Sequence, residues 1–434
     1  MLQATPIHFA SQYTCSSRSS ATASTETRSP CAALAIAPGT SRRLVVNPEL
    51  IVWFQNDLRI AAYREIVSMH AMGLSEFKDF ADLVANAARC IDSTWLPADG
   101  RLQMHGVGLD RACEHVGKQL AKGFRGLSED DFPMHYCAWG KARVGSTALS
   151  NLFGLAGFPS YYQPVKAMLR TAFAGQLPAP WILPFANEHP SIFTKETQGP
   201  YTLGECLFIP IQVLIEAGYP PSRLHLIVLE RDPERSLASW LSKLTMLQPA
   251  EILLRHYVIS ALNVNRVRRY AKHQGVPVTH FVYEASKEPV VAARALFNRL
   301  GLARIFSDTV VTSWGERGQL DSSTSHQIIY PPQPVIYDLP GLHGSDSGYR
   351  YRNGGTSINN EQRDLLEWTG VTKVYQDAVE ACIIDLGLDA ETAARLFGPR
   401  LFGPRLFGPK LSAGAGQPDF LSQSRTLSAA NMIG

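Results

Sequence analysis

A short apolar run, a loop and an amphipathic helix follow one another three times in this chain. Each unit pairs a strand-like run with a predicted helix: 134–139 with a helix from Ser146 to Gly154 or Gly157, 224–230 with 234–247, and 276–285 with 288–302. Repeated alternation of apolar strands and helices predicts an α/β fold, a three-layer sandwich with a mostly parallel central sheet and helical additions. Ligands of such sheets bind at the carboxyl ends of the strands.

Composition divides the chain into four parts. Residues 1–45 are rich in Ser, Thr and Ala without a hydrophobic period, which predicts a disordered N-terminal tail, although an organellar transit peptide has the same composition. The other parts are a helical extension over 46–130, the main domain over 131–390 with further helices over 250–275 and 359–386, and a low-complexity repeat tail over 391–434. The tail contains successive RLFGP units, whose Gly-Pro pairs prevent a continuous helix.

The stretch WGKARVGSTALSN, over 139–151, predicts a phosphate loop. It follows a predicted buried strand and opens into a helix, so backbone N–H groups and the positive helix end would face a ligand. Gly145 would allow close approach, and Ser146 and Thr147 would cap the helix and donate hydroxyls. The spacing is nearly that of an ATP-binding loop, but Ser146 stands where that loop has its lysine. An ordinary capped helix after a glycine turn is the alternative.

A second stretch, LIVLERDPERSLASW, has the residue types of another phosphate site. Arg231 leaves the end of an apolar strand, and Ser239 follows eight residues later on the next predicted helix. A forked guanidinium and a nearby hydroxyl can together bind a phosphate group. The alternative is a local salt bridge between Arg231 and Asp232, with Ser239 on the surface.

Together these stretches resemble the two phosphate motifs of sulfotransferases. GKARVGSTALSNLF resembles their 5′-phosphosulfate loop, VLERDPERSLASW their 3′-phosphate motif, and FVYEA, with Tyr283, the strand whose tyrosine lies near the adenine. The segment from Phe193 to Pro220 also resembles bacterial members, and the likeness covers roughly 134–305 in the same order. One departure is Val144, where the usual loop has a serine. The resemblance implies a P-loop-like version of the sandwich.

The resemblance also implies a reaction, the transfer of a sulfuryl group from 3′-phosphoadenosine 5′-phosphosulfate to an acceptor hydroxyl, without a metal. Arg143, helped by Lys141, would stabilise the departing phosphate together with the N–H groups of the loop. The donor-binding residues would be Arg143, Val144, Gly145, Ser146, Thr147, Arg231, Ser239 and Tyr283. The expected acceptor is a carbohydrate or glycolipid, such as a nodulation-type lipochitooligosaccharide.

The general base is open between several residues of the central segment. Glu196 and His189 are the first candidates, and Glu205 is another. Gln163 stands where some relatives carry a glutamate, and an amide cannot act as a base.

Two other functions remain in view: a P-loop nucleotide kinase or ATPase, and a non-catalytic binding protein that has kept the fold. A formal net charge of +3 over 434 residues argues against a nucleic-acid partner while leaving room for a local cationic site. The seven cysteines form no zinc pattern, and no apolar run approaches the roughly 20 residues of a membrane span. We therefore expect a cytoplasmic protein without a metal.

Overall fold

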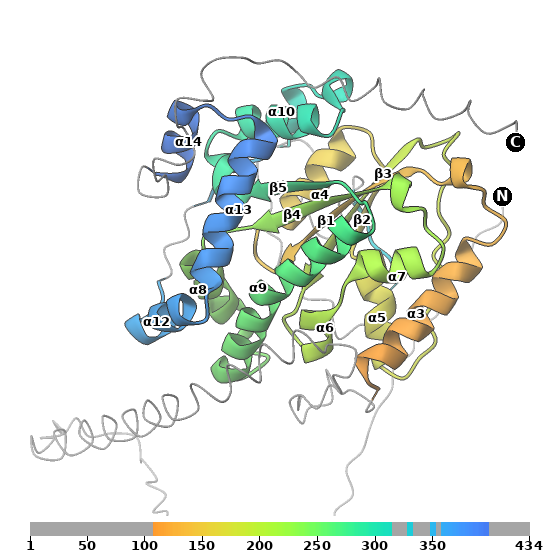
Figure 1. Cartoon of the computed structure of the whole chain (residues 1–434), viewed down its shortest axis with the longest axis horizontal. Helices are drawn as coiled ribbons and strands as arrows, with labels where there is room; N and C mark the ends of the chain where they lie inside the picture. The colour runs from red at the N-terminus through yellow and green to blue at the C-terminus, as the bar shows by residue number, and fades with distance from the viewer. Residues whose placement is uncertain (1–106, 315–327, 333–347, 353–356, 399–434) are drawn as a thin grey trace, which may run out of the picture. The chain divides into compact units, whose positions relative to one another are not determined.

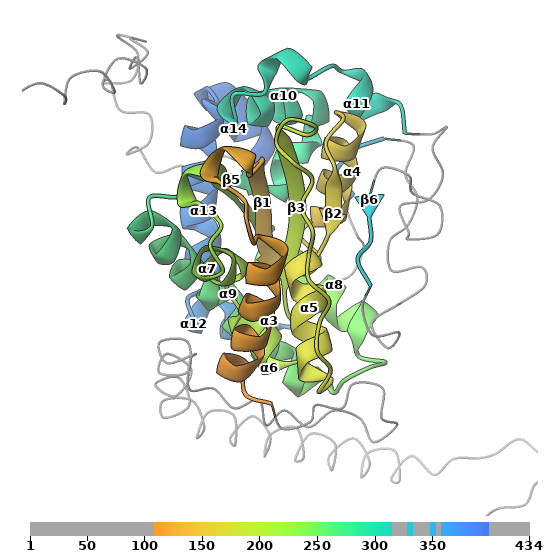
Figure 2. The same cartoon turned by 90° about the vertical axis from the view of Figure 1, so that its right-hand side faces the viewer.

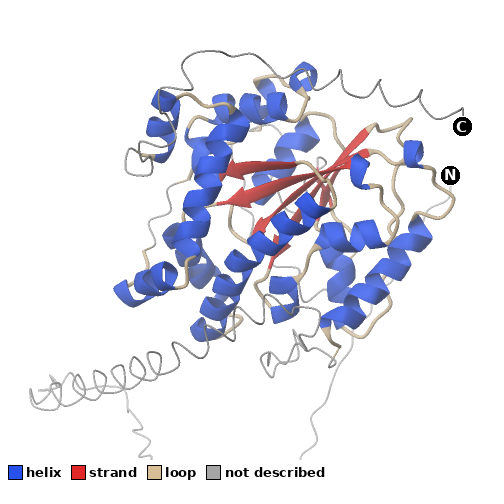
Figure 3. Ribbon diagram, viewed as in Figure 1, coloured by secondary structure: helices blue, strands red, loops and turns tan. Residues whose placement is uncertain are grey.

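The computed structural model describes residues 107–314, 328–332, 348–352 and 357–398 (Figure 1). At its centre is a six-stranded sheet with the strand order β5-β4-β1-β3-β2-β6 (Figure 3). Every neighbouring pair in this sheet is parallel. The strands are β1 (Met134–Lys141), β2 (Ser160–Tyr162), β3 (Ser191–Gln198), β4 (Leu224–Glu230), β5 (Val278–Val282) and β6 (Ile328–Ile329). The predicted α/β fold with a parallel central sheet is therefore confirmed.

Helices cover both faces of the sheet (Figures 1 and 2). One apolar core joins the sheet to α3 (Leu109–Gly123), α5 (Pro164–Phe173), α6 (Leu203–Leu207), α7 (Pro210–Glu216) and α9 (Ala250–His273). The other core joins it to α4 (Ser146–Leu155), α10 (Pro289–Arg299), α11 (Thr309–Thr312), α13 (Val371–Leu386) and α14 (Ala390–Phe397). A third cluster packs α8 (Pro233–Leu244) and α12 (Asn360–Trp368) together with parts of α9 and α13.

The predicted strand–loop–helix units are present with small shifts at their ends. The apolar run at 276–285 forms a shorter strand, because the chain turns at Tyr283 into the 3₁₀ helix η4 (Tyr283–Lys287). The single helix expected over 359–386 is instead two helices, α12 and α13. They are separated at Gly370, whose φ of 77° is a left-handed conformation that glycine adopts without steric cost.

β2 and β3 were not predicted as strands from the sequence. β3 contains the run TKETQ, a polar stretch that does not resemble a buried strand. Its residues from Thr194 to Gln198 are nevertheless all buried, because β3 pairs with both β1 and β2 and carries helices on both faces. Burial of this polar run concentrates charge at the carboxyl end of the sheet.

Two predicted extensions fall partly within the described residues. α3, from the predicted helical extension, packs against α5 and α7 and so belongs to the main core. The first RLFGP unit enters α14, where Leu396 and Phe397 are buried. The predicted N-terminal tail and the later RLFGP units lie outside the described residues. Within the described ranges, no helix combines the length and apolarity needed to cross a membrane.

Candidate functional site

The loop between β1 and α4 lies at the carboxyl edge of the sheet. Its start is held by two bonds: the Ala142 N–H donates to the carbonyl of Gln198 at 3.2 Å, and Trp240 Nε1 donates to the carbonyl of Ala142 at 2.7 Å. α4 then begins after Gly145, the N-cap residue, which has no side chain to cap the helix; Ser146 and Thr147 lie within the first turn. The first N–H groups of a helix have no partner within the helix, so a start of this kind suits an anionic ligand.

Gly145 is needed here for two physical reasons. Its φ of 82° is left-handed, and a Cβ at this position would lie 2.5 Å from Cδ2 of Tyr283. The Tyr283 ring therefore packs directly against the loop backbone, where any larger residue would displace it. This contact brings the tyrosine that follows β5 to the loop that follows β1.

Arg143, Arg231 and Ser239 meet at the same edge. Arg143 Nε donates to Oγ of Ser239 at 3.0 Å, and Nη1 of Arg231 donates to the carbonyl of Arg143 at 3.0 Å, across a separation of 88 residues. The Arg231 guanidinium also lies 4.7 Å from the centroid of the Tyr283 ring. Burial and the charge of Arg231 lower the pKa of Arg143. Two guanidinium groups held this close favour an anion between or above them.

Lys195 is a site residue that sequence reasoning missed. Its Nζ donates to Oγ1 of Thr147 at 3.0 Å and lies 3.8 Å from the centroid of the Tyr162 ring. Burial, followed by the charges of nearby lysine and arginine side chains, lowers the pKa of Lys195 well below its ordinary value. Alternation along β3 puts Lys195 on the face of Phe193, which packs against α4, but this pattern can be used only once the polar run is known to be a strand.

Glu196 points away from the loop, on the opposite face of β3 from Lys195. Its carboxylate is fully buried and accepts the N–H groups of Val165 at 2.9 Å and Lys166 at 3.2 Å, so it caps the start of α5. Burial raises the pKa of Glu196 to about 7 despite these bonds. Because both oxygens are engaged and buried, this position argues against the predicted role as general base.

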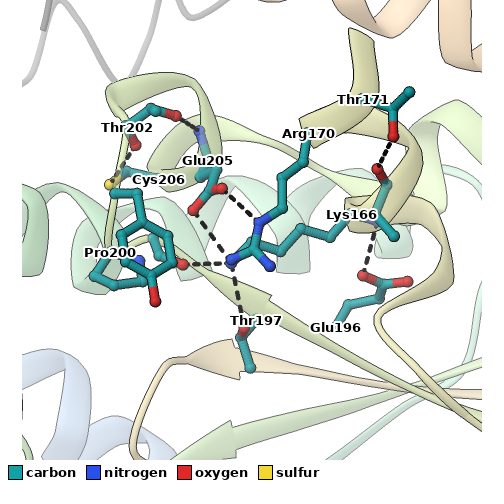
Figure 4. Close-up of polar contacts among 12 residues, drawn as sticks. Lys166, Arg170, Thr171, Glu196, Thr197, Pro200, Thr202, Glu205 and Cys206 are labelled. Atoms are coloured by element: carbon teal, nitrogen blue, oxygen red, sulfur yellow. Dashed lines mark hydrogen bonds and ion pairs between the residues drawn. The ribbon is translucent and has the colours of Figure 1, made fainter. Parts of the chain in front are cut away.

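Glu205 belongs to a buried ionic network beside α5 (Figure 4). It accepts a bond from Nε of Arg170 at 2.8 Å, and Nζ of Lys166 lies 3.4 Å from its other oxygen. Lys166 also donates to Oγ1 of Thr197 at 3.3 Å and to the carbonyl of Gly199. Burial would raise the pKa of Glu205, but the two cations hold it below its ordinary value. Glu205 is therefore a neutralising partner in this structure.

Gln163 is buried directly before α5, the helix that Glu196 caps. It precedes α5 with a left-handed φ of 52°, and its N–H donates to the carbonyl of Lys195 at 2.7 Å. This backbone bond ties the start of α5 to the carboxyl end of β3.

Two other predicted residues lie apart from the loop's ligand-facing side. Lys141 is 1% exposed and forms a buried ion pair with Glu230, with its Nζ 5.7 Å from the centroid of the Tyr257 ring. His189 is exposed and precedes β3, at the amino edge of the sheet. The length of β3, roughly 26 Å at the usual rise per residue, separates it from the carboxyl edge. These positions argue against a donor-facing role for Lys141 and a catalytic role for His189.

Val144 and Ser146 are both buried in the loop. Val144 packs in the core beneath α4, and the carbonyl of Ser146 accepts the hydroxyl of Ser150 at 3.2 Å. They contribute to the loop's shape through packing and backbone.

Charged side chains of both signs surround the site. The cations are Arg143, Lys166, Arg170, Lys195 and Arg231, and the carboxylates among them are Glu196, Glu205, Asp232 and Glu284. Lys141 and Glu230 neutralise each other. After burial, the charges of Lys166, Arg143 and Arg170 lower the pKa of Lys195, and a bound anion would relieve this repulsion.

Among the described residues, no group of three His, Cys, Asp or Glu side chains could hold a metal ion. Comparisons of the chain with protein-family models, with curated proteins and with solved structures found no match.

Proposed function

We propose that this chain is a sulfotransferase that uses 3′-phosphoadenosine 5′-phosphosulfate as its donor. One observation carries the proposal: Arg143 of the first phosphate motif donates to Ser239 of the second and accepts from Arg231. Two motifs far apart in the chain therefore form one cationic site at the carboxyl edge of a parallel sheet, where ligands of such folds bind. A donor with phosphate groups at both ends of a ribose suits two adjoining phosphate motifs.

In this proposal the loop binds the 5′-phosphosulfate. The first-turn N–H groups of α4, Arg143 and the Thr147–Lys195 pair would surround the bridging oxygen and the phosphate. The acceptor oxygen forms a bond to sulfur as the bond from sulfur to the 5′-phosphate breaks, and the acceptor proton passes to a base or to water. By analogy with phosphoryl transfer, charge develops on the leaving phosphate, so fixed cations there accelerate the reaction.

Arg231 and Ser239 would hold the 3′-phosphate and distinguish this donor from ATP. A guanidinium that already rests on the Tyr283 ring is held in one orientation, which reduces the entropy lost on binding. The same ring would lie beside the adenine.

The proposed acceptor is a hydroxyl of a carbohydrate or glycolipid, such as a lipochitooligosaccharide. Tyr162 and Tyr201 lie near enough to Arg143 to affect its pKa, and Tyr162 stacks on Tyr330 with ring centroids 4.6 Å apart. Aromatic rings beside polar groups suit a sugar, which presents both an apolar face and hydroxyls.

Calorimetry with adenosine 3′,5′-bisphosphate, and separately with ATP and magnesium, tests the donor. We expect the bisphosphate to bind, and we expect Arg231→Gln to lose the preference for the 3′-phosphate. Arg125→Gln, at an exposed cation after α3, is the matched control and should bind as the wild type does. Tight ATP binding without bisphosphate binding would favour the kinase or ATPase alternative. Bisphosphate binding without transfer of radiolabelled sulfate to any glycan acceptor would favour a non-catalytic binding protein.

A further inference from the structure

The first unit of the repeated tail is bound to the main domain at a defined place. Arg395, Leu396 and Phe397 form the last turn of α14, and Gly398 follows the helix with a left-handed φ of 88°. α14 packs against η4, which follows β5. The RLFGP sequence, which the proposed donor site does not use, therefore has a binding surface in the described part of the chain.

The cation of this unit binds the start of α10. Nε of Arg395 donates to one oxygen of Glu288 at 2.8 Å, and its Nη2 donates to the other oxygen at 3.3 Å. Glu288 is the residue from which α10 begins. A guanidinium that engages both oxygens of a carboxylate is fixed in direction as well as in charge. This paired contact therefore favours an arginine over a lysine.

The two apolar residues of the unit are buried. Leu396 is 0% and Phe397 is 7% exposed, and both belong to the apolar core cluster that contains Ala285 of η4. The carbonyl of Leu396 accepts a bond from Nζ of Lys287, the last residue of η4. We call the surface over 285–288 the tail socket. It binds three features that follow one another in the chain: an arginine, a leucine with its carbonyl, and a phenylalanine.

The same features recur in the sequence directly after the bound unit. RLFG is repeated at 400–403 and at 405–408. A proline precedes each of these copies, and proline is favoured at the first position of a helix as glycine is just after its end. Each copy therefore has the residue types of the single helical turn that the tail socket contacts. The partial copy at 410–411 has a lysine for the arginine and lacks the phenylalanine.

We infer that the tail socket is a docking site for the R-L-F unit, and that the second unit, 400–402, is its alternative occupant. Arg400 would bind Glu288, and Leu401 would enter the apolar core and present its carbonyl to Lys287. A shift by one unit lengthens the link from α13 by five residues, so the second unit can reach the socket. This docking does not depend on the proposed reaction.

The first unit has the advantage in the unaltered chain. Arg395 also donates to Glu391 at 2.9 Å and to Thr392 at 3.2 Å within α14, and Ala393 is buried. The second unit follows a Gly-Pro pair, which cannot supply the same preceding turns. We therefore expect the second unit to occupy the socket when the first is impaired or detached, which keeps the apolar core behind η4 covered.

Urea unfolding of variants of the full chain tests this docking. Leu396→Ala removes a buried side chain of the first unit, and the second unit can take its place. The decrease in the unfolding midpoint should therefore be about twice as large when Leu401→Ala and Leu406→Ala are also present. Leu401→Ala/Leu406→Ala without the first substitution should leave the midpoint unchanged, because the first unit then holds the socket.

Leu120→Ala, at a fully buried leucine of α3 in the other core, is the matched control. Its decrease in midpoint should be the same with and without the two later substitutions. Hydrogen exchange of the η4 and α10 amides in the folded Leu396→Ala variant is a second measurement, which needs no unfolding. Protection of these amides should be kept when the later leucines are present and should fall when they are absent.

Two results would overturn the inference. One is the same decrease in midpoint for Leu396→Ala with and without the later leucines, because the later units would then not enter the socket. The other is a difference that appears only at high protein concentration, because the occupant would then be the tail of a second copy. A difference that is independent of protein concentration supports docking within one chain.

Discussion

Arg143 holds an unusual backbone position at the centre of the proposed donor site. Its φ of 71° is left-handed although it is not glycine, its side chain bonds Ser239, and its carbonyl accepts from Arg231. Backbone strain of this kind costs about 1–3 kcal/mol and persists where the surroundings enforce it. This backbone conformation directs the guanidinium of Arg143 toward Ser239 of the second phosphate motif.

Substitution of Arg143 should therefore affect turnover more than affinity. We expect Arg143→Gln to lower kcat by about 10²–10³, the usual effect of removing one transition-state donor, with a much smaller change in bisphosphate affinity. Sulfate transfer measured under single-turnover conditions, beside calorimetry of the same variant, separates the two quantities. Equal losses in both would mean that Arg143 only binds the donor.

Gly145 offers a test of the contact between the loop and Tyr283. Gly145→Ala places a Cβ 2.5 Å from the Tyr283 ring, while Gly157→Ala, at a similar left-handed φ of 93°, meets nothing within 4 Å. Both variants lose about 1–2 kcal/mol to backbone strain, and the clash should cost Gly145→Ala a further amount of about 1 kcal/mol or more. Urea unfolding measures the difference. Matching losses in the two variants would show that the ring yields freely.

At the scale of elements, the two faces of β3 carry side chains with different roles. Lys195 faces α4 and the loop, while Glu196 faces α5 and caps it. β3 therefore links the loop between β1 and α4 on one face of the sheet to α5 on the other. The buried charges of this strand are stable only with partners on both sides.

The cap formed by Glu196 should make stability depend on pH. Its folded pKa of about 7 lies above the ordinary value of 4.5, so the unfolded chain loses this proton first as pH rises. This carboxyl therefore lowers wild-type stability between pH 4.5 and 7, by up to about 3 kcal/mol, with no further change above that range. Glu196→Gln should remove this component of the pH dependence.

Urea unfolding at several pH values between 5 and 7.5 tests this expectation. The stability of Glu196→Gln relative to the wild type should rise with pH across this range. Glu251→Gln, at an exposed position near the start of α9, is the control and should stay at a constant offset. A constant offset for Glu196→Gln as well would mean that the folded carboxyl keeps its ordinary pKa.

At the scale of the whole molecule, the alternation of apolar runs and helices was enough to predict the parallel sheet. Sequence reasoning also chose Arg143, Arg231, Ser239 and Tyr283, which the structure brings together. It missed β3 and hence Lys195, because a polar run acquires its burial only from neighbours distant in the chain. The ion-pair partners of Lys141 and Glu205 also come from distant parts of the chain. The sequence alone therefore did not show that these two side chains are paired in the interior and not placed to act on a ligand.

The buried pair of Lys141 and Glu230 joins the two central strands beneath the loop, across 89 residues of chain. Removal of one partner leaves an uncompensated buried charge, so Lys141→Met should cost about 3–5 kcal/mol in unfolding free energy. The double variant Lys141→Met/Glu230→Met replaces the pair with apolar side chains and should recover most of that loss. If Lys141 acts only through this pair, the refolded double variant should also bind adenosine 3′,5′-bisphosphate as the wild type does. A stable double variant with weakened bisphosphate binding would instead show that Lys141 contributes to donor binding.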